Sequence, residues 1–453
     1  MTLTRPTHDS PRLGMSFWLA IVALIATRLW LWTSFQPLEN GDTLIYFRYA
    51  VDGVDLGEVP YRDTDIEYPP LAWWTIAAPR WLAAAPIYRA YLTIGGGDLS
   101  DFQVDYFRKL RALLTGFDLA SFALLSWIVY RRRCEALTAI AWSYVGITGL
   151  LPHVLYERLD IVLLFWLLAW AAAWTKAETT DSPTIWKWLA YVALGLGISF
   201  KLIPLVIVPA CLSADLRQAI KLHQWRALAV SCVVLGLAAL GPFVYYHFAS
   251  GPGVWRMFGY HGERGIEIEA LFASLQFPLR YLGLDLAVSH GFGSINLDSS
   301  LSPALAKLSS VLLLGVLGGS AWLSWRDATQ RERAFAWGLA ALLASVLVAK
   351  VLSVQYMLWT LPLLVLLASE TLDRRRLHTV IGIAITSAAL STVIYPYLFF
   401  PNSAWNLGTV DEPWTLTPVL HWLPCGVLFV RNALLVARVA IAIRPLFVRR
   451  ESR

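Results

Sequence analysis

Apolar stretches of membrane length recur along the whole chain. A bilayer core about 30 Å thick needs roughly 20 apolar residues of α-helix, and a kinked or re-entrant piece can be shorter. Twelve segments meet this requirement: 16–36, 110–130, 135–151, 159–175, 186–200, 202–213, 227–248, 304–325, 335–349, 351–369, 378–398 and 418–443. The fifth and sixth segments are short enough to form one kinked unit. The pattern predicts an all-α polytopic membrane protein with about 12 transmembrane helices, forming a single integral membrane domain over residues 1–453.

One aromatic stretch, residues 71–91, does not fit a span. Two prolines and two arginines interrupt it: Pro79, Arg80, Pro86 and Arg89. Its tryptophans, Trp73, Trp74 and Trp81, are of the kind that is stable at headgroup depth. We therefore expect a helix in the membrane interface, within a loop that covers residues 37–109.

Composition supports the membrane class and sets the orientation. Hydrophobic residues make up 57% of the chain and charged residues 15%, and the mean hydropathy is +0.56. The net charge of +6 does not indicate nucleic acid, because Lys and Arg gather at the ends of apolar runs. With twelve crossings the basic clusters fall on one side: Arg131–Arg133, Arg217/Lys221/Arg226, Arg326/Arg331/Arg333, Arg374–Arg376 and Arg444–Arg453. That side and both termini are predicted to be cytoplasmic, and the loops 37–109 and 249–303 extracytoplasmic, in a multi-pass protein of the cell membrane.

The first predicted extracytoplasmic loop is strongly acidic. It holds eight carboxylates between Glu39 and Glu67 against only two arginines. Such a concentration beside a bilayer suggests a site, and Asp42, nearest the first span, is its leading candidate. The Asp63-Thr64-Asp65 triplet has the spacing of some divalent-cation sites, but an acidic loop produces it by chance, so we expect no metal and no cofactor. The four cysteines are scattered, without CxxC spacing.

Further ionisable residues lie at the predicted extracytoplasmic ends of spans. A charge inside an apolar run costs at least about 2.5 kcal/mol, so each is informative. Arg158 and Asp160 open the fourth span, preceded by His153 and Glu157; on one helix, Glu157 would share a face with both His153 and Asp160. Lys201 and Lys350 lie where apolar segments abut, and snorkelling to the interface is the alternative explanation for both. Cations and carboxylates on one membrane face suit a substrate that carries a phosphate and a hydroxyl to be deprotonated.

Five stretches together resemble the C-type membrane glycosyltransferases of glycosyltransferase family 87, which includes polyprenyl-phosphate-mannose-dependent mannosyltransferases. The stretches are Asp42–Tyr46; Val59–Asp63 with Glu67–Pro70; Glu157–Asp160; Phe200–Pro204 with Pro209; and Glu263–Glu269 with Lys350–Trp359. The resemblance implies transfer of a sugar from a polyprenyl-phosphate donor on the extracytoplasmic face, with inversion at the anomeric carbon. It places the catalytic base on Asp42. Mannose is the first candidate sugar, and a glycolipid or cell-envelope glycan is the expected acceptor.

The chemistry agrees with this assignment. Phosphate is a good leaving group, so an inverting transfer needs one carboxylate base and cations for the departing charge. The predicted substrate-binding residues are Glu67, Tyr68, Arg158, Asp160, Lys201, His261, Arg264, Lys350, Gln355 and Tyr356. A lipid-linked sugar transporter or flippase is the main alternative, and it predicts charges at the membrane midplane and a repeat of broken helices. A non-catalytic scaffold, with a merely solvated acidic loop, is a third possibility.

Overall fold

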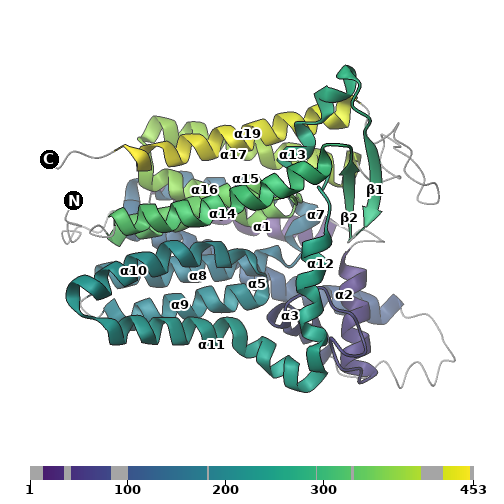
Figure 1. Ribbon diagram of the computed structural model, residues 1–453, viewed down its shortest axis with the longest axis horizontal. Helices are drawn as coiled ribbons and strands as arrows, with labels where there is room; N and C mark the ends of the chain where they lie inside the picture. Colours follow the sequence, from purple (N-terminus) through teal and green to yellow (C-terminus); the bar gives the residue numbers. More distant parts are fainter. Residues whose placement is uncertain are drawn as a thin grey trace.

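Long helices run side by side along the longest dimension of the molecule (Figure 1). The computed structural model describes residues 14–34, 42–82, 100–180, 183–291, 293–327, 331–398 and 422–448. Within them, a helix coincides with each of the twelve apolar segments: α1 (Met15–Ser34), α5 (Ser100–Arg133), α6 (Leu137–Gly149), α8 (Asp160–Thr179), α9 (Pro183–Phe200), α10 (Val208–Leu222), α11 (Trp225–Ser250), α14 (Ser302–Asp327), α15 (Arg331–Val348), α16 (Tyr356–Thr371), α17 (Arg374–Thr392) and α19 (Trp422–Phe447).

The polytopic helical class is confirmed. In the described residues, eight helical stretches are long and apolar enough to cross a membrane, and two shorter apolar helices lie within α15 and α16. The exact number of crossings stays a prediction. A short 3₁₀ turn, η3 (Ile203–Ile207), joins α9 to α10. Pro204 lies in it, and a proline cannot donate the backbone hydrogen bond that would continue α9.

Residues 153–160 do not lie on one helix. The four-residue helix α7 (Pro152–Leu155) ends in a turn, and α8 begins afresh at Asp160. Glu157 therefore lies in the turn and shares no helical face with His153 or Asp160. Burial lowers the pKa of His153 to about 4, so its imidazole is neutral. Asp160 occupies the first turn of α8, where unpaired backbone N–H groups stabilise a negative charge.

The first loop folds into short helices at one end of the bundle (Figure 1). They are α2 (Asp42–Ala50), its π-helical continuation η1 (Val51–Asp55) and α3 (Pro70–Trp81). The expected interface helix begins as α3, and residues 83–99 lie outside the described part of the chain. Trp73 does not face the interface: it is 2% exposed and rests against Gly53, where an added Cβ would lie 2.5 Å from its ring. Trp74 and Trp81 are exposed.

The second long loop adds a small β-hairpin that the apolar pattern did not predict. Strands β1 (Ala287–Gly291) and β2 (Ser294–Asp298) pair antiparallel, with Val288 opposite Leu297. The loop also contains η4 (Gly251–Trp255), α12 (Arg256–Glu263), α13 (Leu271–Ser274) and η5 (Phe277–Leu282). The hairpin, α12, α13 and α7 lie at the same end as α2 and α3 (Figure 1). We call this end of the bundle the loop end.

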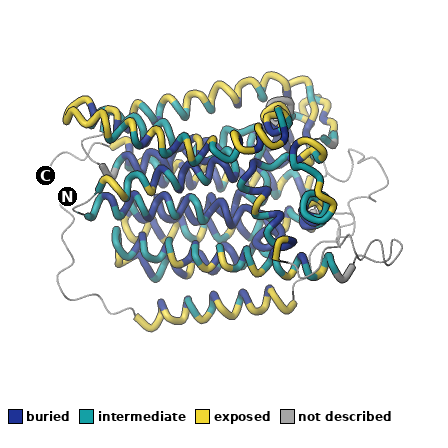
Figure 2. The backbone as a smooth tube through the Cα atoms, turned by 90° about the horizontal axis from the view of Figure 1, so that it is seen from below, coloured by how far each residue is buried: buried dark blue, intermediate teal, exposed yellow. Residues whose placement is uncertain are grey.

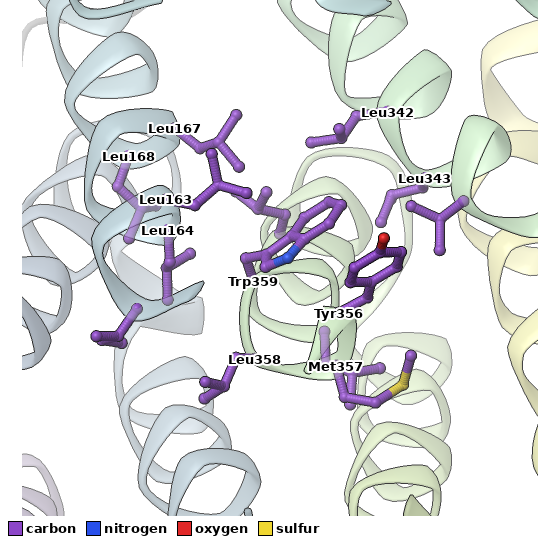
Figure 3. Packing of buried hydrophobic residues seen from close by; sticks show 14 of the residues in the cluster. Leu163, Leu164, Leu167, Leu168, Leu342, Leu343, Tyr356, Met357, Leu358 and Trp359 are labelled. Atoms are coloured by element: carbon purple, nitrogen blue, oxygen red, sulfur yellow. The ribbon is translucent and has the colours of Figure 1, made fainter. Parts of the chain in front are cut away.

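Buried residues concentrate in the middle of the bundle (Figure 2). α16 is buried on all sides from Tyr356 to Ser369, as expected for a helix that is apolar all round. At its start, Trp359 and Tyr356 pack among leucines of α8 and α15 (Figure 3). This packing fixes the first turn of α16 beside the start of α8.

The predicted basic clusters meet at the end of the bundle opposite the loop end. Arg132 of α5 forms an ion pair with Glu178 of α8 (2.6 Å), and its guanidinium lies 4.0 Å from the ring centroid of Phe335 in α15. Several arginines donate to main-chain carbonyls at helix ends: Arg133 to Leu372 (2.6 Å), Arg217 to Arg326 (2.5 Å) and Arg333 to Leu446 (3.4 Å). We call this the basic end. Its cytoplasmic position remains a prediction from the positive-inside rule.

Candidate active site

Asp42 is the first residue of α2, at the loop end. Its Oδ2 accepts from Arg158 in an ion pair and from the hydroxyl of Tyr46 at 3.4 Å. The Asp42 side chain is 20% exposed. The carboxylate is therefore held in place by Arg158 and Tyr46 and is still partly accessible to a substrate.

Arg158 lies in the turn between α7 and α8, so it reaches across to Asp42 from the side of the bundle. Its Nη2 donates to the hydroxyl of Tyr395 at 3.0 Å, and its guanidinium lies 5.5 Å from the centroid of that ring. Tyr395 belongs to the π-helical turn η6 (Val393–Leu398) after α17. The sequence predicts that Arg158 binds the substrate. The structure pairs it with Asp42, and its contact with a phosphate stays a prediction.

Tyr46, which is buried, and Tyr68, which is half-buried, form a pair behind Asp42. Their hydroxyl oxygens lie 3.3 Å apart, and the hydroxyl of Tyr61 donates to the Tyr68 carbonyl at 2.8 Å. Burial raises the pKa of Tyr46 and of Tyr68, and the nearby charge of Glu67 raises both further. Both phenols therefore stay protonated, and Tyr46 can donate to the Asp42 carboxylate.

A second ion pair joins Asp160 to Lys201. The Lys201 ammonium donates to Oδ1 of Asp160 at 2.7 Å, and the indole N–H of Trp359 donates to the same oxygen at 3.0 Å. The ammonium also lies 5.0 Å from the ring centroid of Tyr356. Asp160 is 5% exposed and Lys201 23%, so the carboxylate is fixed inside the bundle and the amine lies toward its surface.

Arg264 and Lys350 form a pair of neighbouring cations. Burial lowers the pKa of Lys350, and the like charge of Arg264 lowers it further. Arg264 also donates to the Ser294 hydroxyl at 3.4 Å. The carbonyl of Lys350 accepts from the Glu267 amide at 2.9 Å, which fixes the loop of Arg264 beside Lys350. Two cations held close together suit a phosphate group.

Sequence reasoning did not single out two buried glutamates of this loop or their partner. Glu267 and Glu269 are each 6% exposed, and no hydrogen bond reaches Oε2 of Glu267 from the described residues. Arg431 of α19 is fully buried and donates to the Glu269 carbonyl at 2.9 Å, with its carboxylate at 3.4 Å. Burial raises the pKa of Glu269 to about 8, against the opposing charge of Arg431. In the sequence, the polar pair Arg431–Asn432 inside an apolar run was the feature that could have pointed to this buried partner.

For some predicted residues, the structure gives no interaction with the other candidates. Gln355 precedes α16, and no hydrogen bond joins its side chain to the other candidates among the described residues. The side chain of His261 and the loop 399–417 lie outside the described part of the chain.

The Asp63-Thr64-Asp65 triplet does not converge on one point. Asp63 accepts from Arg62 at 2.9 Å and from the Val59 amide at 2.9 Å, whereas Asp65 pairs with Arg256 at 3.2 Å. Within the described ranges, no three His, Cys, Asp or Glu side chains are grouped as metal ligands.

Two crystal structures of ArnT from Cupriavidus metallidurans are similar in fold, each 14% identical in sequence. The structure bound to undecaprenyl phosphate covers 95% of this chain and 77% of its own, with a TM-score of 0.39. The apo structure covers 93% and 76%, with a TM-score of 0.38. This likeness is too distant to carry an argument, and no curated protein matches significantly.

The family model of glycosyltransferase family 87 matches residues 105–350, more than half of the chain. The matched range contains Arg158, Asp160, Lys201, Arg264 and Lys350, and begins after Asp42. A bundle of apolar helices with clustered charges at one end accords with a membrane glycosyltransferase. The chain belongs to glycosyltransferase family 87.

Proposed function

We propose that this glycosyltransferase moves a sugar from a polyprenyl-phosphate donor to a hydroxyl of a glycolipid or cell-envelope glycan, on the extracytoplasmic face. The sugar is a hexose or pentose, with mannose the first candidate from the family resemblance. The observation that carries the proposal is the Asp42 carboxylate, which Arg158 and Tyr46 hold in place at the loop end and which is 20% exposed.

The reaction is a single inverting displacement. The acceptor hydroxyl oxygen attacks the anomeric carbon from the face opposite the phosphate, and the bond from that carbon to the phosphate oxygen breaks. Oδ1 of Asp42 takes the hydroxyl proton, and the phosphate departs with the bonding electron pair. Because a phosphate is stable as an anion, no acid is needed to protonate the leaving group.

The cations have different roles in this scheme. Arg264 and Lys350 bind the departing phosphate, because the hydrogen bond from the Glu267 amide to the Lys350 carbonyl holds their two segments together. Arg158 orients Asp42, and Lys201 is held by Asp160 at the edge of the same region. Arg158 and Lys201 are therefore positioning residues here, and their removal should act through the carboxylates that they bind.

The support for the donor class is the family resemblance, which points to polyprenyl-phosphate sugars. A lipid-linked donor also suits a site at the end of a membrane bundle, where an isoprenoid chain remains in the bilayer while the phosphate reaches charged residues.

The experiment is transfer from radiolabelled polyprenyl-phosphate mannose by the purified protein, with membrane glycolipids or envelope glycans as acceptors and EDTA present. Transfer of label to an acceptor supports the donor class and independence from divalent metals. Movement of the intact donor across vesicles without transfer would instead support the flippase. No transfer from mannose, with transfer from another polyprenyl-phosphate sugar, would replace mannose and leave the mechanism unchanged.

A further inference from the structure

A cleft at the basic end lies far along the bundle from the candidate active site. It has a volume of about 680 Å³ between the α16–α17 turn and the last turns of α19. Its lining combines polar and charged side chains with apolar ones: Thr371, Leu372, Asp373, Arg376, Thr379, Ile441, Arg444, Pro445 and Val448. Nothing in the proposed transfer reaction uses it.

Positive charge predominates in the cleft. Arg376 and Arg444 are exposed there, and no ion pair or hydrogen bond engages the Arg444 side chain from the described residues. Asp373 is the one carboxylate of the lining, and it is already used. It accepts from the Arg376 amide at 2.9 Å as the N-cap of α17, and its other oxygen lies 3.4 Å from the Arg376 guanidinium. An anion would find cations in the cleft and no unoccupied acid.

A buried cation above the cleft adds to this imbalance. Arg438 is 0% exposed, and none of its three guanidinium nitrogens has a hydrogen-bond partner among the described residues. It lies three residues before Ile441 on α19, about 4.5 Å along the helix axis. A buried charge without a partner is costly, and a nearby anion offsets part of that cost.

The geometry points to an anionic phospholipid as the occupant of this cleft. Its phosphate would lie between Arg376 and Arg444, and its acyl chains would follow Leu372, Ile441 and Pro445 toward the bilayer. Basic clefts between membrane helices on the cytoplasmic side bind anionic headgroups for these reasons. The chain's own next residues, Arg449 to Arg453, suit the cleft poorly, because three of the five are arginine.

The test compares two double variants that remove the same charge. Arg376→Ala/Arg444→Ala empties the cleft of cations, whereas Arg374→Ala/Arg375→Ala removes two exposed arginines of α17 that do not line it. Retention of phosphatidylglycerol and of phosphatidylcholine is measured by native mass spectrometry on the full chain in detergent. All four arginines are exposed, so both proteins should fold, and thermal unfolding checks this.

We expect the wild type to retain phosphatidylglycerol in preference to phosphatidylcholine. The cleft variant should bind phosphatidylglycerol roughly tenfold or more weakly, and the matched variant within about twofold of wild type. Equal loss of phosphatidylglycerol binding in both variants would show that exposed arginines attract the lipid without a specific cleft. Equal retention of phosphatidylglycerol and phosphatidylcholine would show that the headgroup charge does not determine binding. Either result would contradict the proposal. Displacement of the lipid by inorganic phosphate at constant ionic strength would make a free anion the occupant. None of these outcomes depends on transfer activity.

Discussion

At the basic end, Arg133 and Arg217 donate to main-chain carbonyls, whereas at the loop end Arg158 and Lys201 pair with the carboxylates of Asp42 and Asp160. A carbonyl at a helix end needs a donor whatever the protein does, so the first arrangement joins helices together. A partly exposed carboxylate, such as Asp42, can exchange a proton with a substrate. Charge at a helix end is thus structural where its partner is a main-chain carbonyl, and is available for chemistry where its partner is an accessible carboxylate.

Two aspartates provide a matched pair for this comparison. Asp160 accepts from Lys201 and Trp359, and Asp327 at the basic end accepts from Arg333 at 2.8 Å and from the indole of Trp337 at 3.2 Å. Each is thus bound by a cation and a tryptophan N–H, and Asp327 also pairs with Arg326 at 2.8 Å.

Of this pair, Asp160→Asn is expected to have the larger effect on transfer. It leaves the Lys201 ammonium without its counter-ion beside the site, and transfer should fall at least about 100-fold. Asp327→Asn should lower the melting temperature and keep kcat within about twofold of wild type. Comparable losses of kcat in both variants, at equal folded fraction, would end the distinction between the two ends.

The next effect concerns the paired cations. Lys350→Met removes one of the two charges assigned to the departing phosphate and should lower kcat/KM by about 10–100-fold. Lys187→Met is the control, because Lys187 forms an ion pair with Asp215 at the basic end. Steady-state kinetics with varied donor measure both, and an unchanged kcat/KM in Lys350→Met would remove Lys350 from phosphate binding.

A smaller effect is the pH dependence of stability from Glu269. Its pKa is raised to about 8 in the folded protein, so the folded state holds a proton that the unfolded chain releases near its ordinary value. The associated stability is present at pH 4 and is lost as the pH rises through about 8. Melting temperatures across this range should fall for wild type and fall less for Glu269→Gln. Parallel curves for the two proteins would contradict the assignment.

The smallest effect on activity is expected at the basic end. Arg133→Gln removes the donors to the carbonyls of Ser369 and Leu372 and should lower the free energy of unfolding by about 1–3 kcal/mol. Transfer by the folded fraction should be unchanged. Denaturant unfolding followed by an activity assay separates the two quantities, and a loss of kcat would mean that this end also contributes to the chemistry.

The helices were predictable because an apolar run of membrane length predicts a helix by itself, whatever segments lie beside it. The turn at residues 156–159 was not, because it depends on how α7 and α8 pack and has no glycine or proline inside it. The β-hairpin was missed for a similar reason. Its strands are short and lie in a loop between two apolar runs, where the apolar pattern predicts no element.

The charged residues of the candidate site were visible in the sequence, whereas the ion pairs between them were not. Asp42, Asp160, Lys201 and Lys350 stand out in sequence because a charge at the end of an apolar run is costly. Which carboxylate meets which cation depends on helix packing, so the partnership of Arg158 with Asp42 was not visible. The contact from Arg431 to Glu269 joins residues more than 160 positions apart, and no local pattern encodes it.

The most direct test of the central claim is the transfer rate of Asp42→Asn beside wild type and Asp52→Asn. Asp52 belongs to the same acidic loop, so its substitution controls for the charge of the loop. If Asp42 is the base, Asp42→Asn should lose at least about 1,000-fold in kcat with an unchanged melting profile, and Asp52→Asn should stay near wild type. Wild-type transfer by a folded Asp42→Asn protein would contradict the account.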